Sequence, residues 1–224
     1  GRQCKCSNHL CDSMVSCVNF LFPFADKPEA LAALLRPVFP SLKRVKPMEE
    51  SGLWLAIEWI GLENYLGEVK RGDRERTRGA LFTSLDAAVR FEDASGRTQI
   101  ALIEWKYTES YARSSKAEGK SGARRQAIYR DFFEAADGPI DTSKVPDYLD
   151  LFYEPFYQMM RQQLLADQME KYGELGAEAV TVVHVCPKKN NDFCRVTSPD
   201  LAPLGQSAAE VWKSLLRKPT RFIK

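Results

Sequence analysis

The sequence contains no apolar run long enough to cross a membrane. Its longest strongly apolar stretch, Val15 to Phe24, falls short of the roughly 20 residues that a spanning helix needs, and Asn19 and Pro23 interrupt it. A basic segment followed by an apolar stretch and a small-residue cleavage site is also missing, so neither a membrane partner nor secretion is predicted. We therefore expect a cytoplasmic protein. The first residue is Gly1 rather than Met, which suggests a trimmed or partial chain from which an upstream segment could be missing.

An excess of one charge sign is absent too. The chain has 32 Lys plus Arg against 30 Asp plus Glu, so its net charge of +2 does not by itself indicate a polyanionic partner. Internal repeats and low-complexity tracts are lacking, and 44% hydrophobic residues in a chain of 224 are enough to bury a core. We expect one domain, with residues 1–25 as an N-terminal extension and residues 26–224 as its core.

The cysteines lack the spacing of a zinc site. Four of the six, Cys4, Cys6, Cys11 and Cys17, crowd the amino terminus beside His9. Structural zinc sites usually present two separated pairs of ligands, whereas here one short segment would have to surround the ion alone. We expect reduced thiols with Cys17 buried, and a zinc-organised interaction module remains an alternative.

The pattern of apolar residues predicts an α/β protein. A helix is expected over 28–35, because Asp26 is an N-cap candidate, Pro28 suits a first turn and Pro37 ends the pattern. Alternating or short apolar runs predict strands, and apolar spacing of three to four predicts helices. The strands are expected at 53–60, 81–91, 98–107 and 179–185, and further helices at 124–136, 151–172 and 207–217.

Two of these strands bring ionisable residues together. The polar segment 92–97 contains Gly96 and is typical of a hairpin turn. If the turn is centred on Ser95, residues whose numbers sum to 190 face each other, and Asp86 then lies opposite Glu104. Side chains alternate along a strand, so Lys106 projects on the same side as Glu104. A shift of one residue in the turn would undo this pairing.

The apolar flanks of these residues predict that both acids are buried. Buried carboxylates need a partner or a cation, and Mg²⁺ prefers oxygen ligands of this kind. The lysine would then orient or help to deprotonate an attacking water, or offset charge on a phosphate. A lysine bridged to two acids without any ion is the structural alternative.

The residues around this trio resemble a known signature. Ser84-Leu85-Asp86, a hairpin, and then Ile103-Glu104-Trp105-Lys106 are similar to the D…E-x-K motif of the PD-(D/E)XK nuclease superfamily, with Leu85 where proline is common. The stretches 78–86 and 103–111 are similar to a little-characterised bacterial family within it, as are the segments 17–20 and 156–165. The likeness covers most of the chain.

This resemblance implies a restriction-endonuclease-like core, in which a central mixed sheet is flanked by helices. It also implies that Asp86 and Glu104 hold Mg²⁺ or Mn²⁺ together with the backbone carbonyl of Trp105, and that water attacks the phosphorus. Asp86, Glu104 and Lys106 are then the expected catalytic residues.

Three further residues are less specific candidates. Glu58 lies in an apolar strand and is a candidate extra metal ligand, as an upstream glutamate is in related nucleases; a salt-bridged core glutamate is the alternative. Gln163 borders the apolar stripe of a long helix and is a candidate accessory residue, against an ordinary surface position. His184 lies within an apolar strand and is expected to be a core histidine.

Basic residues flank the expected site on both sides. Phosphate backbones are held by Lys and Arg irrespective of base sequence, so these loops are candidates for gripping nucleic acid. Ordinary solvated loop charge is the alternative. The expected contacts are Arg74, Arg76 and Arg78 before the first motif strand and Lys120 and Arg124 after the second.

Two classes of function follow. The first is a metal-dependent nuclease that hydrolyses phosphodiester bonds of DNA or RNA. The second is a catalytically inactive nucleic-acid-binding or scaffold protein with the same fold. The sequence leaves the choice between DNA and RNA open, and the oligomeric state as well, with a homodimer as one candidate.

Overall fold

A six-stranded mixed sheet forms the centre of the computed structural model, which describes residues 11–48, 52–68 and 82–224. Its strands are β1 (Leu42–Lys46), β2 (Ala56–Trp59), β3 (Leu85–Asp93), β4 (Thr98–Trp105), β5 (Ala179–Val185) and β6 (Phe222–Ile223). The α-helices of the described residues are α1 (Ser13–Leu21), α2 (Pro28–Leu35), α3 (Gly122–Glu134), α4 (Phe156–Tyr172) and α5 (Ala208–Leu215). The predicted α/β class, a mixed sheet flanked by helices as in a restriction-endonuclease-like core, is confirmed.

The strand order is β1-β3-β4-β5-β6, and β2 also pairs with β3. The pairs β1–β3, β2–β3 and β3–β4 are antiparallel, whereas β4–β5 and β5–β6 are parallel. One edge of β3 is shared, because β2 pairs with residues near its start and β1 with residues near its end. The centre of the sheet is therefore β3 and β4, the two strands that carry the acidic motif.

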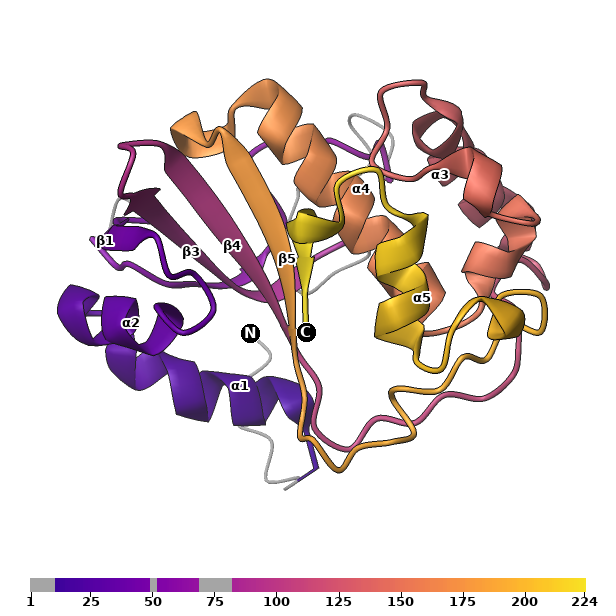
Figure 1. Ribbon diagram of the computed structural model, residues 1–224, viewed down its shortest axis with the longest axis horizontal. Helices are drawn as coiled ribbons and strands as arrows, with labels where there is room; N and C mark the ends of the chain where they lie inside the picture. The colour runs from indigo at the N-terminus through magenta and orange to yellow at the C-terminus, as the bar shows by residue number, and fades with distance from the viewer. Residues whose placement is uncertain (1–10, 49–51, 69–81) are drawn as a thin grey trace, which may run out of the picture.

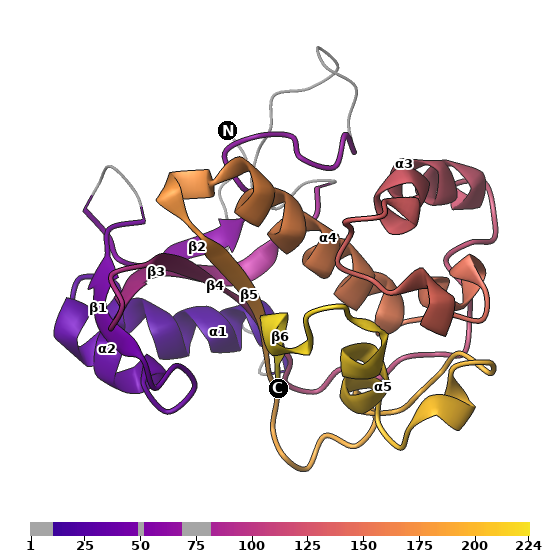
Figure 2. The ribbon, with the colours of Figure 1, turned by 45° about the horizontal axis from the view of Figure 1, so that its top comes forward.

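Helices cover both faces of this sheet. Figures 1 and 2 show α1 and α2 on one face and α4 with α5 on the other. Side chains alternate along β3 and β4, so Val89 and Ala101 join the core beneath α1 and α2, while Ile100 and Leu102 join the core beneath α4. Among the described helices, none has the length and apolarity that crossing a bilayer requires.

The assignment of residues 1–25 to an extension outside the core is corrected for the described part of that segment. Asp12 caps α1 by accepting a hydrogen bond from the backbone N–H of Val15 at 3.1 Å. The helix then buries Cys17 and Leu21 against the sheet, and Ala25 follows them into the same core. The apolar run is visible in the sequence, but a helix of nine residues is too short for its period alone to identify it.

Other boundaries differ from expectation for local reasons. The helix predicted over 151–172 begins only at Phe156, because Pro155 lacks an N–H and disfavours helical geometry in the residue before it. A short 3-10 helix, Tyr148–Phe152, precedes it. Helix α2 is preceded by Lys27 rather than capped by Asp26. Strand β1 escaped prediction because three of its five residues are basic.

Candidate active site

The hairpin between β3 and β4 has the register that the sequence predicted. Ala87 pairs with Ile103, and every pair down to the turn sums to 190. Asp93 fixes the turn, since its Oδ1 accepts the backbone N–H groups of Ser95 at 2.9 Å and of Arg97 at 3.1 Å. Continuing the register by one residue beyond the last pair puts Asp86 opposite Glu104.

Glu104 and Lys106 form a buried ion pair. The Lys106 Nζ lies 2.6 Å from the Glu104 Oε1, and the two residues, Lys106 and Glu104, are 7% and 3% exposed. Burial lowers the pKa of Lys106, but the charge of Glu104 outweighs it and the pKa is raised overall. The lysine therefore stays a cation. It lies one residue beyond the end of β4, and the ion pair shows that it projects to the same side as the glutamate.

Asp86 lies where β3 and β4 diverge. Its Oδ2 accepts a hydrogen bond from the backbone N–H of Trp105 at 2.6 Å. This side-chain bond lies beyond Ala87 and Ile103, the last paired residues of the two strands. Burial, followed by the charge of Glu104, raises the pKa of Asp86 to about 7, although the hydrogen bond from Trp105 opposes this. The two acids are thus close enough to repel each other, and Lys106 supplies only one compensating charge.

Helix α4 holds the glutamate from the other side. Gln158 Nε2 donates to Glu104 Oε1 at 2.7 Å, and Gln162 Nε2 donates to Oε2 at 2.6 Å. The two glutamines are four residues apart and so share one face of the helix. Burial raises the pKa of Glu104. The charge of Lys106 and the hydrogen bonds from the two amides lower it, but burial outweighs them and the pKa is raised overall. Neither glutamine was predicted, although their spacing of four residues on a predicted helix was a usable signal.

A histidine completes this arrangement. His184 pairs with Glu104 across the parallel strands β4 and β5, and its Nε2 lies 2.8 Å from Gln162 Oε1. Because a carboxylate only accepts hydrogen bonds, Gln162 must turn its N–H toward Glu104 and its carbonyl toward the histidine. The histidine must then carry its proton on Nε2. Burial lowers the pKa of His184 to about 3, so it is neutral, as expected of a core histidine.

Replacing His184 with leucine is expected to lower the free energy of unfolding by about 1–3 kcal/mol, because the buried Gln162 carbonyl would lose its donor. Urea unfolding measures this. The matched control is His184→Gln, which keeps an N–H donor and should lose less. Equal losses in both variants would show that ring packing, rather than the hydrogen bond to Gln162, is what the fold requires.

The donor set at this site suits a small hard cation better than a softer one. In the described ranges, no three or more His, Cys, Asp or Glu residues are grouped to hold a metal. Glu104 uses three of about four lone-pair positions, and Asp86 Oδ1 accepts no hydrogen bond from any described residue. Mg²⁺ is commonly held by one or two carboxylates and several waters, so the residues present fit it.

Glu58 lies on β2 opposite Asp86 of β3, since its neighbours Ile57 and Trp59 pair with Ala87 and Leu85. Its backbone has a φ of 49°, a left-handed conformation that costs energy in a residue other than glycine and interrupts the alternation of side chains. The residue is half-buried. It is not grouped with the two motif acids, so its role as a further ligand stays a prediction.

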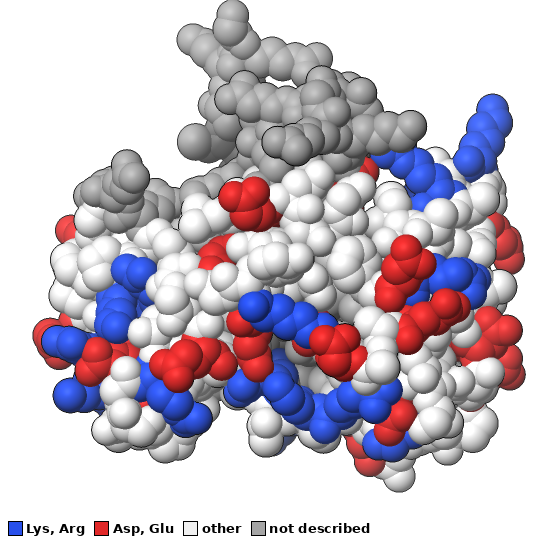
Figure 3. Space-filling view, turned by 90° about the horizontal axis from the view of Figure 1, so that it is seen from above, with Lys and Arg blue, Asp and Glu red and all other residues white. Residues whose placement is uncertain are grey.

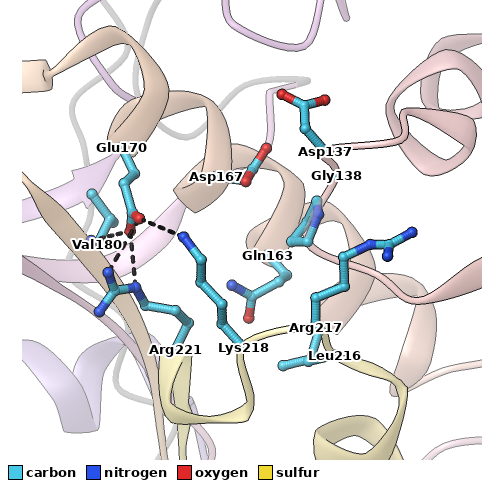
Figure 4. Close-up of a pocket in the computed structure, with 11 residues that line it drawn as sticks. Asp137, Gly138, Gln163, Asp167, Glu170, Val180, Leu216, Arg217, Lys218 and Arg221 are labelled. Atoms are coloured by element: carbon cyan, nitrogen blue, oxygen red, sulfur yellow. Dashed lines mark hydrogen bonds and ion pairs between the residues drawn. The ribbon is translucent and has the colours of Figure 1, made fainter.

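Gln163 lies elsewhere. It is 2% exposed and lines a small pocket of about 80 Å³, where its Oε1 has no hydrogen-bond partner among the described residues. Figure 4 shows its amide within this pocket, which Asp167, Arg217 and Lys218 also line. The expectation that Gln163 faces the motif is corrected, because the face of α4 that meets Glu104 carries Gln162 instead.

The basic residues are only partly described. Arg74, Arg76 and Arg78 lie outside the described residues, as do Cys4, Cys6 and His9 of the amino-terminal cluster. Lys120 is exposed just before α3. Arg124, near the start of that helix, donates to the backbone carbonyl of Glu68 at 3.1 Å and lines a large pocket.

The mixed sheet flanked by helices is that of a restriction-endonuclease-like protein. The model of the family described as "Restriction Endonuclease associating with ARP" matches residues 2–221, and the chain belongs to that family. The description assigns the family to nucleases, whose substrate is nucleic acid. Neither the comparison with curated proteins nor that with solved structures gives a match.

Proposed function

We propose that this protein is a magnesium-dependent nuclease of the PD-(D/E)XK type, which hydrolyses phosphodiester bonds of DNA or RNA. The observation that carries the proposal is the convergence of Asp86, Glu104 and Lys106 at the point where β3 and β4 separate. A buried acid and a half-buried acid, with one ammonium paired to the buried one, leave negative charge that a divalent cation would offset.

Each residue of the trio has a separate task in this proposal. Asp86 and Glu104 would hold the ion, with the backbone carbonyl of Trp105 as a third ligand. The N–H of Trp105 points to Asp86, and the N–H and C=O of one strand residue point the same way, which supports that third ligand. When bound, Mg²⁺ polarises the phosphoryl group and lowers the pKa of a coordinated water.

Lys106 would act as a fixed cation. Its raised pKa argues against a role as general base, so we assign it the orientation of the attacking water and the stabilisation of charge that develops on the phosphate. Gln158 and Gln162 are positioning residues in this scheme. They hold both oxygens of Glu104, which limits the reorganisation needed during the reaction.

The test is cleavage by the purified protein, with Mg²⁺ or Mn²⁺, of labelled single- and double-stranded DNA and RNA. We expect cleavage of at least one substrate, lost in excess chelator and restored by the metal. Activity that persists in chelator would contradict the metal-dependent mechanism. Binding of nucleic acid without any cleavage would favour the alternative, an inactive binding or scaffold protein with this fold.

A further inference from the structure

A larger pocket lies beside the acidic motif. It has a volume of about 550 Å³, within the range of sites for nucleotide-sized ligands, and it opens between α3, α4 and the loop before α3. Cations outnumber anions in its lining. The charged residues are Lys116, Arg124, Arg125 and Arg161 against Glu68 and Glu154.

Glu68 does not offer its charge to a ligand. Its carboxylate, in a residue 7% exposed, accepts hydrogen bonds from the backbone N–H and hydroxyl of Thr83, and from Tyr129 at 2.7 Å. It also pairs with Arg161 at 3.3 Å. The acid is therefore satisfied by protein groups, and the pocket retains an excess of positive charge from its other basic residues.

Two arginines of the pocket, Arg161 and Arg125, are each held in place by contacts of the guanidinium group with other protein groups. Arg161 donates through Nε to the Thr83 hydroxyl at 3.0 Å and lies over the ring of Tyr157 at 5.3 Å. Arg125 donates to the backbone carbonyl of Lys116 at 3.0 Å. A guanidinium has five N–H donors, so each of these contacts fixes the group and leaves other donors for a ligand. Groups ordered in advance lose less entropy when they bind.

The loop that carries Lys116 is anchored as well. The backbone N–H of Lys116 donates to the carbonyl of Phe152 at 2.7 Å, and Ser115 pairs with Tyr153 in an isolated bridge. No hydrogen bond of the Lys116 ammonium to a described residue is found, and the side chain is half-buried in the pocket wall. The ammonium therefore keeps its donors for a ligand, although the nearby Glu154 carboxyl, whose pKa this charge lowers, offsets part of its charge.

The pocket and the acidic motif share one wall. Glu154, which lines the pocket, accepts the backbone N–H of Gln158 at 3.2 Å, and the Gln158 amide donates to Glu104. Glu154 and Gln158 thus connect the pocket lining to the Glu104 carboxylate. Figure 3 shows basic and acidic side chains interleaved on one face of the molecule. The excess of cations over anions in this pocket therefore rests on its own lining.

We infer that the pocket binds a phosphate-bearing nucleotide of a nucleic-acid strand, next to the bond that the motif would cleave. The inference rests on the proposed function for the identity of the ligand. Arginine and lysine contact phosphates without reading bases, and the two tyrosines of the lining, Tyr129 and Tyr157, are only 3% and 6% exposed. The pocket should therefore hold the strand irrespective of its sequence.

The test measures binding apart from cleavage. A fluorescein-labelled single strand of about 12 nucleotides, within the usual site size for single-strand binding, is titrated as DNA and as RNA in chelator. Anisotropy gives the affinity at several salt concentrations. Lys116→Gln and Arg125→Gln are compared singly and together with the parent. The matched control combines Arg130→Gln and Lys144→Gln, which remove two exposed charges outside the pocket.

Each pocket variant should reduce the slope of log affinity against log salt by about 0.7, and the pair by about 1.4, since one phosphate contact is lost per charge. The control should keep the parent's slope. An unchanged slope in the pocket pair, or an equal fall in the control, overturns the inference. Binding of thymidine 5′-monophosphate that depends on Lys116, combined with strand binding that does not, overturns it as well.

These experiments distinguish a failure of the pocket inference from a failure of the proposed nuclease function. A parent that cleaves with Mg²⁺ while the pocket variants bind like the parent would reject the pocket alone. A parent that never cleaves, but whose strand binding depends on Lys116 and Arg125, would reject the nuclease proposal and retain the pocket. Lys116→Gln removes no hydrogen bond between described side chains, so this single variant remains informative if the double variant unfolds.

Discussion

Replacing Lys106 with alanine is expected to lower the single-turnover rate of cleavage by about 100-fold to 1,000-fold, the usual cost of removing a preorganised charge at a reacting group. Substrate binding should change little, because the ammonium is buried against Glu104 and the basic residues of the pocket supply the grip. Cleavage and anisotropy on the same preparations separate the two effects. An unchanged rate in Lys106→Ala would reject the assigned role.

The same substitution has a consequence for stability. It would leave Glu104 as a buried carboxylate without its counter-ion, and breaking such a pair typically costs about 3–5 kcal/mol. Magnesium should restore part of this loss, and its affinity should not fall, because no ligand has been removed. Lys43→Ala is the control: its side chain is 61% exposed in an ion pair on β1 and should affect neither property.

The hairpin at the site was predictable because its information is local. The polar turn, its glycine and the alternation of apolar residues fix both the register and the faces, and the observed pairing of Ala87 with Ile103 agrees with a turn centred on Ser95. The long apolar strand β5 and the major helices were predictable for a similar reason, since period alone distinguishes them.

The partners of Glu104 were not predictable in the same way. Gln162 and Gln163 are adjacent, but neighbours on an α-helix point about 100° apart, so choosing between them requires the rotation of α4 against the sheet. His184 faces Glu104 only because β4 and β5 are parallel in one particular register. Both facts depend on tertiary packing, and a single sequence carries no direct signal for either.

The short elements were missed for another reason. Strand β1 has the sequence Leu-Lys-Arg-Val-Lys, and its basic residues hide the apolar pair Leu42 and Val45 that the core uses. It is held by pairing with β3 and by ion pairs from Lys43 and Arg44 to Glu92. Long-range partners of this kind override weak local preference.

Asp86→Asn is expected to make the metal-free protein more stable at neutral and alkaline pH. The folded pKa of Asp86 is raised from 3.8 to about 7, so the unfolded chain ionises first as pH rises. The parent should lose stability between about pH 4 and pH 7 and keep that deficit above pH 7. Asparagine carries no charge, and its carbonyl can still accept the Trp105 N–H.

We expect Asp86→Asn to raise the free energy of unfolding at pH 8 by about 2 kcal/mol, and Tm by roughly 4–8 °C, because one pKa unit is worth about 1.4 kcal/mol and water at this half-buried group reduces the effect. Thermal unfolding in chelator at pH 5 and pH 8 measures it. The control, Asp131→Asn, changes an exposed acid of α3 and should shift neither value.

Magnesium should reverse the ranking. A ligand at about 100 times its dissociation constant stabilises the folded protein by about 2.7 kcal/mol, so the parent should gain this amount while Asp86→Asn, which lacks one carboxylate ligand, gains little. Cleavage should be lost in the variant at the same time. A variant that is more stable without metal, insensitive to metal and inactive would identify Asp86 as a residue kept for binding the ion at the expense of stability. A metal-induced rise in Tm equal to that of the parent would instead place the ion away from Asp86.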